Sequence, residues 1–251
     1  QRRDRWVLAT KVANPMIASD PNSGGLGRKW ILYEVDTSLR RLGTDYIDVF
    51  HLHGVQPKDY DHAHDVLAPA LLRQRERGKI RFLGITEAMN TDFDHIMLKR
   101  AMNDDCWDVV MILFNMMHQG ARGPILSQLA ERGIGTLIMS AARSMFSNPA
   151  LLDRTVKELA AAGKVPADLA KSDNPLGFLV HEGGADSVID AAYRFARHEH
   201  GADVVLFGTG NAAHLEANIA SLLKSPLPQS DVNRIVELFG DLNDVGMREA
   251  G

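Results

Sequence analysis

Short apolar runs alternate along the chain with longer stretches whose apolar residues recur at helical spacing. The short runs are rich in β-branched residues and nearly continuous, as is typical of parallel strands buried on both faces. They are Trp6–Val12, Tyr46–His53, Ile80–Thr86, Val109–Asn115, Gly135–Ala141 and Val204–Thr209. The helical patterns between them are Lys29–Leu42, His62–Gly78, Asp92–Asn103, Gly123–Arg132, Ser187–Arg197 and Ala212–Leu223. This alternation predicts successive β/α units and an α/β fold with a parallel sheet.

The pattern indicates about six β/α units, whereas a closed (β/α)8 TIM barrel has eight. A six-stranded remnant would leave two bare parallel edges, which is costly. We therefore expect a TIM barrel whose first two units precede Gln1 and are missing from this sequence, or a partner that covers the open edge.

The whole chain, 1–251, is expected to form a single barrel domain. A long loop, 144–186, joins the fifth strand to its helix, and a short helix is expected within it at Pro149–Ala162. Long barrel loops of this kind usually act as lids or binding segments. A last amphipathic stretch, 229–242, predicts a C-terminal helix packed outside the barrel.

Composition excludes several classes of protein. A net charge of −4 with no Lys/Arg cluster argues against a nucleic-acid partner. Cys106 is the single cysteine, so no internal disulfide can form, which favours a reducing compartment. No apolar run reaches the roughly 18 residues of a membrane helix. The first residues lead into a strand-like run rather than a signal peptide. The expectation is a cytoplasmic protein with no membrane partner.

Candidate chemistry lies where the predicted strands end, because barrel active sites form at the C-terminal ends of strands. The polar residues there are Lys11, His51, His53, Thr86, Glu87, Asn115, Ser140 and Thr209. A lysine at a strand end can be a catalytic cation, or it can extend from the rim into solvent.

His51 and His53 are two apart on one strand and therefore face the same side. The more common outcome is one packed core histidine and one functional histidine. A His-x-His pair can also hold zinc, which would suggest a metal-dependent barrel hydrolase. That reading needs further ligands, and the later strand ends, Thr86, Asn115, Ser140 and Thr209, offer poor ones.

A second signal is the glycine turn Gly208-Thr209-Gly210-Asn211, which runs from the last strand into a helix. Glycines let the backbone approach an anion, and a helix N-terminus directs N–H groups at it. Such turns are also common for geometric reasons alone. Its place on the last strand, where barrels often bind phosphate, strengthens the prediction.

Three stretches together resemble the aldo-keto reductases. Ser38–Asp48, followed by Leu52-His53, is similar to that family's helix, strand and catalytic histidine. Gly78–Thr86 is similar to its next strand, and Gly208–Asn211 with His214, Leu215 and Asn218 resembles its C-terminal nucleotide-binding motif. The resemblance runs in order from Trp6 to about Leu242 and so covers nearly the whole chain.

The resemblance implies a catalytic tetrad of Asp, Tyr, Lys and His, in which Lys11 is the lysine and His53 the histidine. The tyrosine is the general acid, the lysine lowers its pKa, the aspartate holds the lysine, and the histidine orients the carbonyl. The aspartate and tyrosine should come from the second β/α unit, before Gln1.

None of the tyrosines present, Tyr33, Tyr46, Tyr60 and Tyr193, sits at a matching position. Tyr60 follows the histidine strand and could reach the mouth, but an exposed loop tyrosine is the favoured interpretation. The chain alone is therefore expected to be inactive or nearly so.

The resemblance also implies NADP or NAD as the cofactor. The cofactor-binding residues that it implies are Thr86, Glu87, Met111, Ser140, Arg143, Gly208, Thr209, Gly210, Asn211, His214 and Asn218. Several depart from the family pattern: Glu87 stands where an asparagine is usual, and Met111 where a glutamine is common. Gly208 and His214 replace a lysine and an arginine that often bind the 2′-phosphate, which argues against a strong preference for NADPH. Arg143 near the pyrophosphate would compensate in part.

The predicted function is an oxidoreductase that reduces a small-molecule carbonyl by hydride transfer, or oxidises an alcohol or sugar lactol in reverse. The alternative is a non-catalytic relative that binds a nucleotide or a partner protein through the same mouth. The absent tyrosine and the altered cofactor shell favour that alternative. Neither the substrate nor the oligomeric state is predicted by the sequence.

Overall fold

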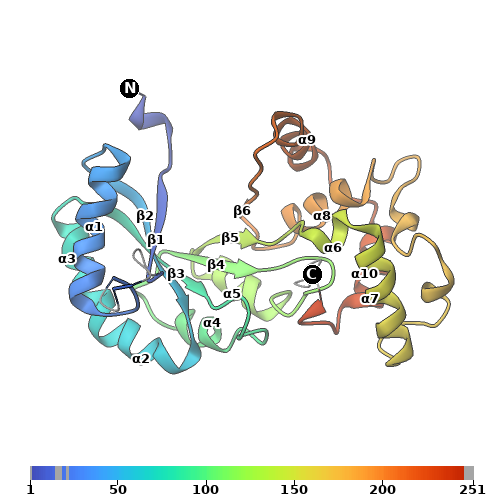
Figure 1. The fold of residues 1–251 in the computed structure, drawn as a ribbon, viewed down its shortest axis with the longest axis horizontal. Helices are drawn as coiled ribbons and strands as arrows, with labels where there is room; N and C mark the ends of the chain where they lie inside the picture. The colour runs from blue at the N-terminus through green and yellow to red at the C-terminus, as the bar shows by residue number, and fades with distance from the viewer. Residues whose placement is uncertain (1, 15–18, 21–22, 246–251) are drawn as a thin grey trace. The chain divides into compact units, whose positions relative to one another are not determined.

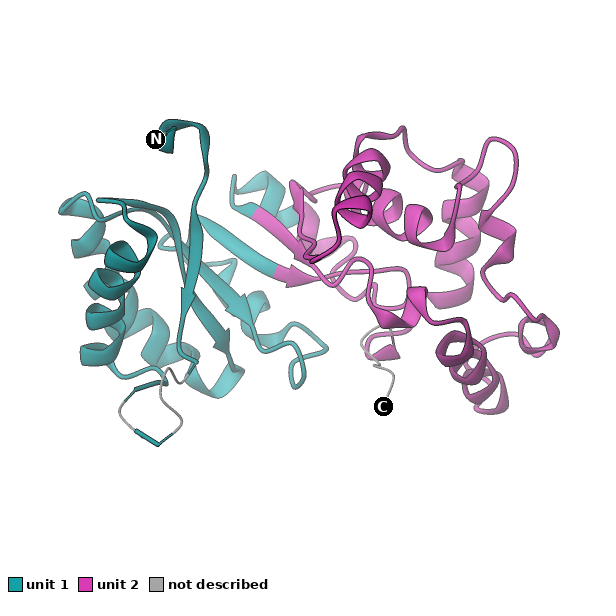
Figure 2. Cartoon of the chain, turned by 45° about the horizontal axis from the view of Figure 1, so that its top comes forward, with its two compact units in different colours: residues 1–111, 128–135 teal, residues 112–127, 136–251 magenta. Residues whose placement is uncertain are grey.

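The computed structural model describes residues 2–14, 19–20 and 23–245. The chain divides into two compact units, shown in Figure 2. Unit 1 comprises Gln1–Met111 and Gln128–Gly135, and unit 2 comprises Ile112–Ser127 and Thr136–Gly251. In the described part of the chain, no helix combines the length and the apolar character that a membrane crossing requires.

Unit 1 is built on neighbouring parallel strands in chain order. These are β1 (Ala9–Val12), β2 (Ile47–Val55), β3 (Ile80–Glu87) and β4 (Val109–Leu113), the last of which continues into unit 2. The register sets Lys11 beside His51, His51 beside Gly84, and Thr86 beside Met111. The C-terminal ends of the strands therefore bring several of the predicted site residues into adjacent rows.

Helices cover the strands of unit 1 (Figure 1). They are α1 (Arg28–Leu42), α2 (Tyr60–His62), α3 (Ala68–Glu76) and α4 (Ile96–Ala101), with a π-helical segment, Ala63–Leu67, joining α2 to α3. Helix α1 lies against β1, and α3 lies against β3. Gly43 ends α1 in the left-handed conformation, at φ 63°, which a glycine adopts without steric cost. Phe50, Leu71 and Ile85 are fully buried between these layers.

A buried carboxylate joins the N-terminal segment to β2. Asp48 accepts hydrogen bonds from Arg3 at 2.7 Å, from Arg81 at 2.9 Å and from the Leu8 N–H at 2.9 Å. Burial raises the pKa of Asp48, but these donors outweigh it, so the pKa lies below its ordinary value. The Arg3 guanidinium also lies 3.8 Å from the centre of the Tyr46 ring.

Unit 2 has a shorter stretch of regular pairing. Strand β5 (Gly135–Met139) pairs in parallel with β6 (Val204–Val205), with Leu137 beside Val204. Two hydrogen bonds between Thr136 and Asp203 stabilise the pairing of β5 with β6. The Thr136 N–H donates to the Asp203 carboxylate at 2.8 Å, and the Asp203 N–H donates to the Thr136 hydroxyl at 2.9 Å.

Several helices follow these strands in unit 2. They are α6 (Ser144–Ser147), α7 (Pro149–Ala161), α8 (Val188–Arg197), α9 (Ala212–Leu223) and α10 (Gln229–Phe239), and α5 (Pro124–Glu131) has its first residues in this unit. The long loop 144–186 thus contains α6, α7 and two short 3-10 turns, Leu169–Lys171 and Gly177–Leu179. Asn148 caps α7 and Ser187 caps α8 through side-chain oxygens, which explains where these helices begin.

Several predicted strands were too long, and the excess was largest, at three residues or more, in Trp6–Val12 and Val204–Thr209. Trp6 and Val7 are 69% and 77% exposed and precede β1, and the residues after Val205 leave the ladder. An apolar run predicts a strand only where a neighbour supplies hydrogen-bond partners along its full length. The predicted helix Ala212–Leu223 agrees with α9 at both ends.

Candidate active site

Lys11 and His53 occupy neighbouring strand ends in unit 1. Lys11 lies on β1 and is exposed, and its Nζ is 3.9 Å from the Met111 sulfur. His53 is half-buried near the end of β2. Burial lowers the pKa of His53, and the positive charge of Lys11 lowers it further. Lys11 therefore lies close enough to His53 to lower its pKa, and Met111 lies beside Lys11.

His51 is the packed member of the histidine pair. It is fully buried, and its ring lies over Gly84 so closely that a Cβ on Gly84 would be 2.3 Å from His51 Cδ2. His51 Nδ1 donates to the Thr10 carbonyl oxygen at 3.4 Å, while Nε2 has no hydrogen-bond partner among the described residues. Burial lowers the pKa of His51 to about 4, so the ring is neutral at neutral pH. His51 is therefore a packed residue of the core, while His53 is only half-buried.

Thr86 fixes the backbone immediately after His53. The Thr86 hydroxyl accepts a hydrogen bond of 2.7 Å from the N–H of Gly54, and Gly54 has φ +62°. The chain turns here because β2 departs from regular register with β3 between Leu52 and Val55. A residue expected to contact the cofactor thus also positions the histidine strand.

Glu87 is directed at His95, which is not among the predicted site residues. The Nδ1–H of His95 donates to the Glu87 carboxylate at 2.7 Å, and each side chain is 1% exposed. His95 has left-handed backbone angles, φ 55° and ψ 35°, just before α4 begins. A carboxylate buried at a strand end requires a partner, and that requirement was the available signal. Its identity could not be deduced, because His95 stood inside a predicted helix.

Tyr60 is not an exposed loop tyrosine, and that expectation was wrong. It begins α2, is 3% exposed, and its hydroxyl donates to Asp104 and accepts from Trp107 Nε1. The Arg100 guanidinium lies 4.8 Å from the centre of its ring. Burial and the Asp104 carboxylate raise the pKa of Tyr60 above its ordinary value, which opposes a role in proton transfer.

The other tyrosines do not replace it. Tyr33 is exposed on α1, beside the Trp30 ring. Tyr46 precedes β2, at the opposite end of that strand from His53. Tyr193 is buried in α8 of unit 2, and burial raises its pKa.

In unit 2, Ser140 and Arg143 follow β5. Ser140 has a positive φ of 64°, and its carbonyl oxygen accepts a hydrogen bond from Asn115 Nδ2 at 3.1 Å. Asn115 Oδ1 in turn accepts from the Met117 N–H at 2.9 Å. Arg143 occupies the position before the first residue of α6. Asn115 thus serves to hold the turn that carries Ser140.

The glycine turn after β6 leads into α9. Asn211 caps this helix by accepting from the N–H groups of Ala213 at 2.8 Å and His214 at 3.3 Å, and its own N–H donates to the Thr209 hydroxyl at 3.1 Å. A Cβ on Gly208 or Gly210 would meet nothing within 4 Å. These positions are exposed, as is His214, whereas Asn218 is half-buried one turn later. The turn leaves open space above a helix N-terminus.

Within the described ranges, no group of three or more His, Cys, Asp or Glu side chains is arranged to hold a metal ion. A metal-dependent hydrolase therefore gains no support from the geometry around His51 and His53.

The model of the aldo/keto reductase family matches residues 1–239. The chain belongs to the aldo/keto reductase family. The aldo-keto reductase YhdN of Bacillus subtilis is 25% identical over 250 residues, covering 94% of this chain and 72% of that protein. The L-glyceraldehyde 3-phosphate reductase of Escherichia coli is 34% identical over 84 residues, covering 34% of this chain and 23% of that protein.

A solved structure shares the fold. The holo form of aldo-keto reductase AKR11C1 from Bacillus halodurans superimposes with a TM-score of 0.69 at 20% identity, covering 95% of this chain and 74% of that one. The predicted family and the predicted TIM-barrel fold are confirmed. As a family member, the chain is an oxidoreductase of the aldo-keto reductase type, whose activity is NAD(P)H-dependent carbonyl reduction.

The burial of His51 predicts a pH dependence of stability. The pKa of His51 is about 4 in the folded chain, against an ordinary value of 6.5, so the unfolded chain takes up the proton first as pH falls. The free energy of unfolding should therefore decrease from about pH 6.5 to about pH 4, by on the order of 3 kcal/mol, and then level off with respect to this group.

Urea unfolding of the wild type and His51→Leu between pH 7 and pH 4 measures this effect. Uptake of one proton changes the free energy of unfolding by about 1.4 kcal/mol per pH unit. The variant should show a shallower decrease, because leucine does not titrate. Parallel curves for the two proteins would show that His51 is not the group responsible.

Proposed function

We propose that the chain binds NADP or NAD and takes part in reduction of a small-molecule aldehyde or ketone, or in reverse oxidation of an alcohol or sugar lactol, with Lys11 and His53 as its catalytic side chains. The observation that carries this proposal is the pairing of an exposed lysine with a half-buried histidine on adjacent strand ends. A lowered pKa keeps His53 neutral at neutral pH, so its ring can hydrogen-bond a carbonyl oxygen without carrying a charge.

Lys11 supplies the positive charge. An ammonium group near the carbonyl oxygen stabilises the negative charge that develops there during reduction, and it lowers the pKa of a neighbouring acid. Met111, 3.9 Å from Lys11 Nζ, offers only a weak sulfur acceptor, so Lys11 keeps donors for other groups.

A separate phosphate-binding role is proposed for the glycine turn of unit 2. The open space above Gly208 and Gly210, at the start of the 12-residue helix α9, suits the close approach of a phosphate. Ser140, Arg143, Thr209, Asn211, His214 and Asn218 complete the proposed set in this unit. When bound, the nicotinamide cofactor supplies the hydride.

In unit 1, Thr86, Glu87 and Met111 are proposed to contact the nicotinamide near Lys11 and His53. The side chains of Thr86 and Glu87 already hydrogen-bond to Gly54 and His95. We therefore propose that Thr86 and Glu87 contribute mainly to the shape of the nicotinamide site. The placement of the tyrosines favours a second candidate function, a relative that binds the nucleotide without turnover.

The first test is the turnover of Lys11→Met. In any form of the protein that turns over, this substitution should lower kcat/KM by about 100-fold or more, because it removes the charge next to the reacting oxygen. Lys29→Met, on the exposed face of α1, is the matched control and should leave kcat/KM unchanged. Equal values for wild type and Lys11→Met would remove Lys11 from the proposal.

Residues 1–251 assayed alone should bind NADPH or NADH, seen as a change in cofactor fluorescence, without measurable carbonyl reduction. Turnover by this protein that is lost in Tyr60→Phe would contradict the account of Tyr60. Cofactor binding without turnover in every longer form would instead support the non-catalytic function.

The second test concerns the choice of cofactor. Combining Gly208→Lys with His214→Arg should strengthen NADPH binding by about 10-fold or more, since each adds a charge-assisted contact for the 2′-phosphate. Affinity for NADH, which lacks that phosphate, should change much less. The open space at Gly208 accommodates the new side chain.

Ala220→Lys, an exposed position later in α9, controls for the added charge. Fluorescence titration with both cofactors gives the affinities. An equal gain for NADH and NADPH, or no gain for either, would show that this turn does not meet the 2′-phosphate.

A further inference from the structure

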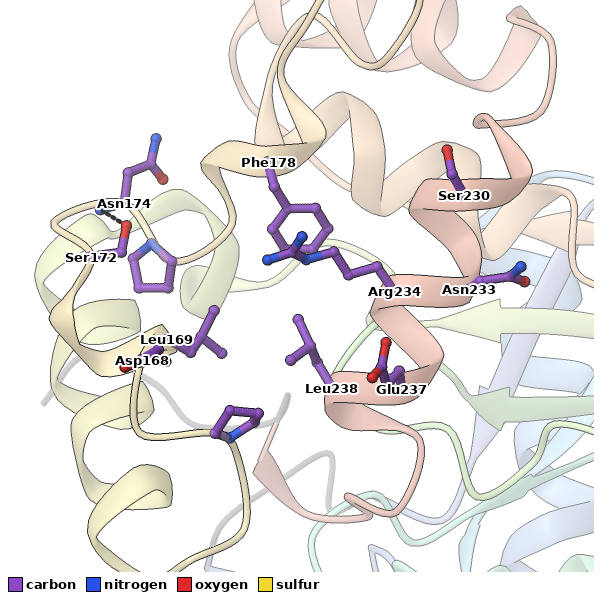
Figure 3. Close-up of a pocket in the computed structure, with 12 residues that line it drawn as sticks. Asp168, Leu169, Ser172, Asn174, Phe178, Ser230, Asn233, Arg234, Glu237 and Leu238 are labelled. Carbon is purple, nitrogen blue, oxygen red and sulfur yellow. Dashed lines mark hydrogen bonds between the residues drawn. The ribbon is translucent and has the colours of Figure 1, made fainter.

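Unit 2 contains a cavity of about 540 Å³ that the proposed reductase chemistry does not use. It lies between the segment 166–178 and helix α10, as Figure 3 shows. Leu169 and Phe178 line it from the segment, and Leu238 lines it from α10. This volume is in the range of small-molecule sites, which are typically about 300–1,000 Å³.

Arg234 gives this cavity, whose lining is mixed polar and apolar, a fixed positive charge. Its guanidinium carbon lies 4.6 Å from the centre of the Phe178 ring, and Figure 3 shows the side chain reaching from α10 toward that ring. Stacking on an aromatic face orients a guanidinium and leaves its N–H groups available at the edge. Within the described residues, no ion pair joins Arg234 to a carboxylate.

Neither acidic residue of the lining, Asp168 or Glu237, forms an ion pair with Arg234 among the described residues. Asp168 pairs with Lys171 at 2.6 Å, and this hydrogen bond and charge lower the pKa of Asp168. Glu237, three residues after Arg234 on α10, is the other carboxylate in the lining. In Figure 3 it stays near its own helix, while Arg234 extends to Phe178. A single guanidinium balances a single negative charge, and a doubly charged phosphate would meet too few cations here.

We propose that this cavity binds a small aromatic monocarboxylate. The carboxylate pairs with the Arg234 guanidinium, whose planar fork matches carboxylate geometry, and the ring packs among Leu169, Phe178 and Leu238. Ser172 and Asn174 form a polar rim on one side, and Ser230 and Asn233 on the other. The site requires neither the nicotinamide cofactor nor Lys11, so it goes beyond the proposed function.

Binding of naphthalene-2-carboxylate to the 251-residue protein tests the proposal. Calorimetry measures the affinity, and NMR shifts of residues lining the cavity locate the bound ligand. Naphthalene-2-carboxamide, of the same shape but neutral, is the matched ligand and should bind at least about 10-fold more weakly. Arg234→Gln should weaken carboxylate binding by about 10-fold or more and leave carboxamide binding unchanged. The carboxylate affinity of Arg234→Lys should lie between those of the wild type and Arg234→Gln. Lysine keeps the positive charge but lacks the planar guanidinium that can donate to both carboxylate oxygens.

Glu237→Gln should change the affinity for the carboxylate in the opposite direction. Removing a like charge from the lining should strengthen carboxylate binding about 2- to 5-fold without changing carboxamide binding. Arg234 and Glu237 are both exposed, so the melting temperature of each variant should match that of the wild type and confirm folding. Equal affinity for the two ligands, no loss in Arg234→Gln, shifts confined to other regions, or no binding at millimolar ligand would each overturn the proposal.

Discussion

The arrangement of unit 1 depends on one contact, the packing of the His51 ring against the bare backbone of Gly84. Any side chain at Gly84 would collide with the ring, so this glycine allows β2 and β3 to pair with a histidine between them. The ring is neutral, and its buried Nε2 lacks a partner among the described residues, a cost that the surrounding packing offsets. With His51 held inward, His53 lies two residues further along β2 at the strand end, next to Lys11.

Much of the fold could be predicted from the sequence because its helices and parallel strands have strong periodic patterns. Ala212–Leu223 was predicted to the residue, since its cap Asn211 and its apolar spacing agree. Trp6–Val12 and Val204–Thr209 were overextended, because an apolar run does not reveal where pairing stops. Tyr60 was misplaced for a related reason: only the tertiary structure shows that Asp104 and Trp107 surround its hydroxyl.

The site was predicted unevenly. Lys11 and His53 were predicted from their strand ends and from the family resemblance, and their catalytic role stays a prediction. The structure adds that the charge of Lys11 lowers the pKa of His53. The partner of Glu87 could not be identified, because His95 reaches it through a left-handed backbone that no periodic pattern predicts. The cavity beside Arg234 was equally hidden, since it forms between segments roughly sixty residues apart in the chain.

The most direct test of the account is the titration of His53 by NMR in the wild type and in Lys11→Met. Burial and the charge of Lys11 both lower the pKa of His53, so removing that charge should raise the pKa toward its ordinary value while burial keeps it below. Lys29→Met should leave the titration unchanged. A His53 pKa that is the same in Lys11→Met and in the wild type would contradict the claim that these two residues form one catalytic unit.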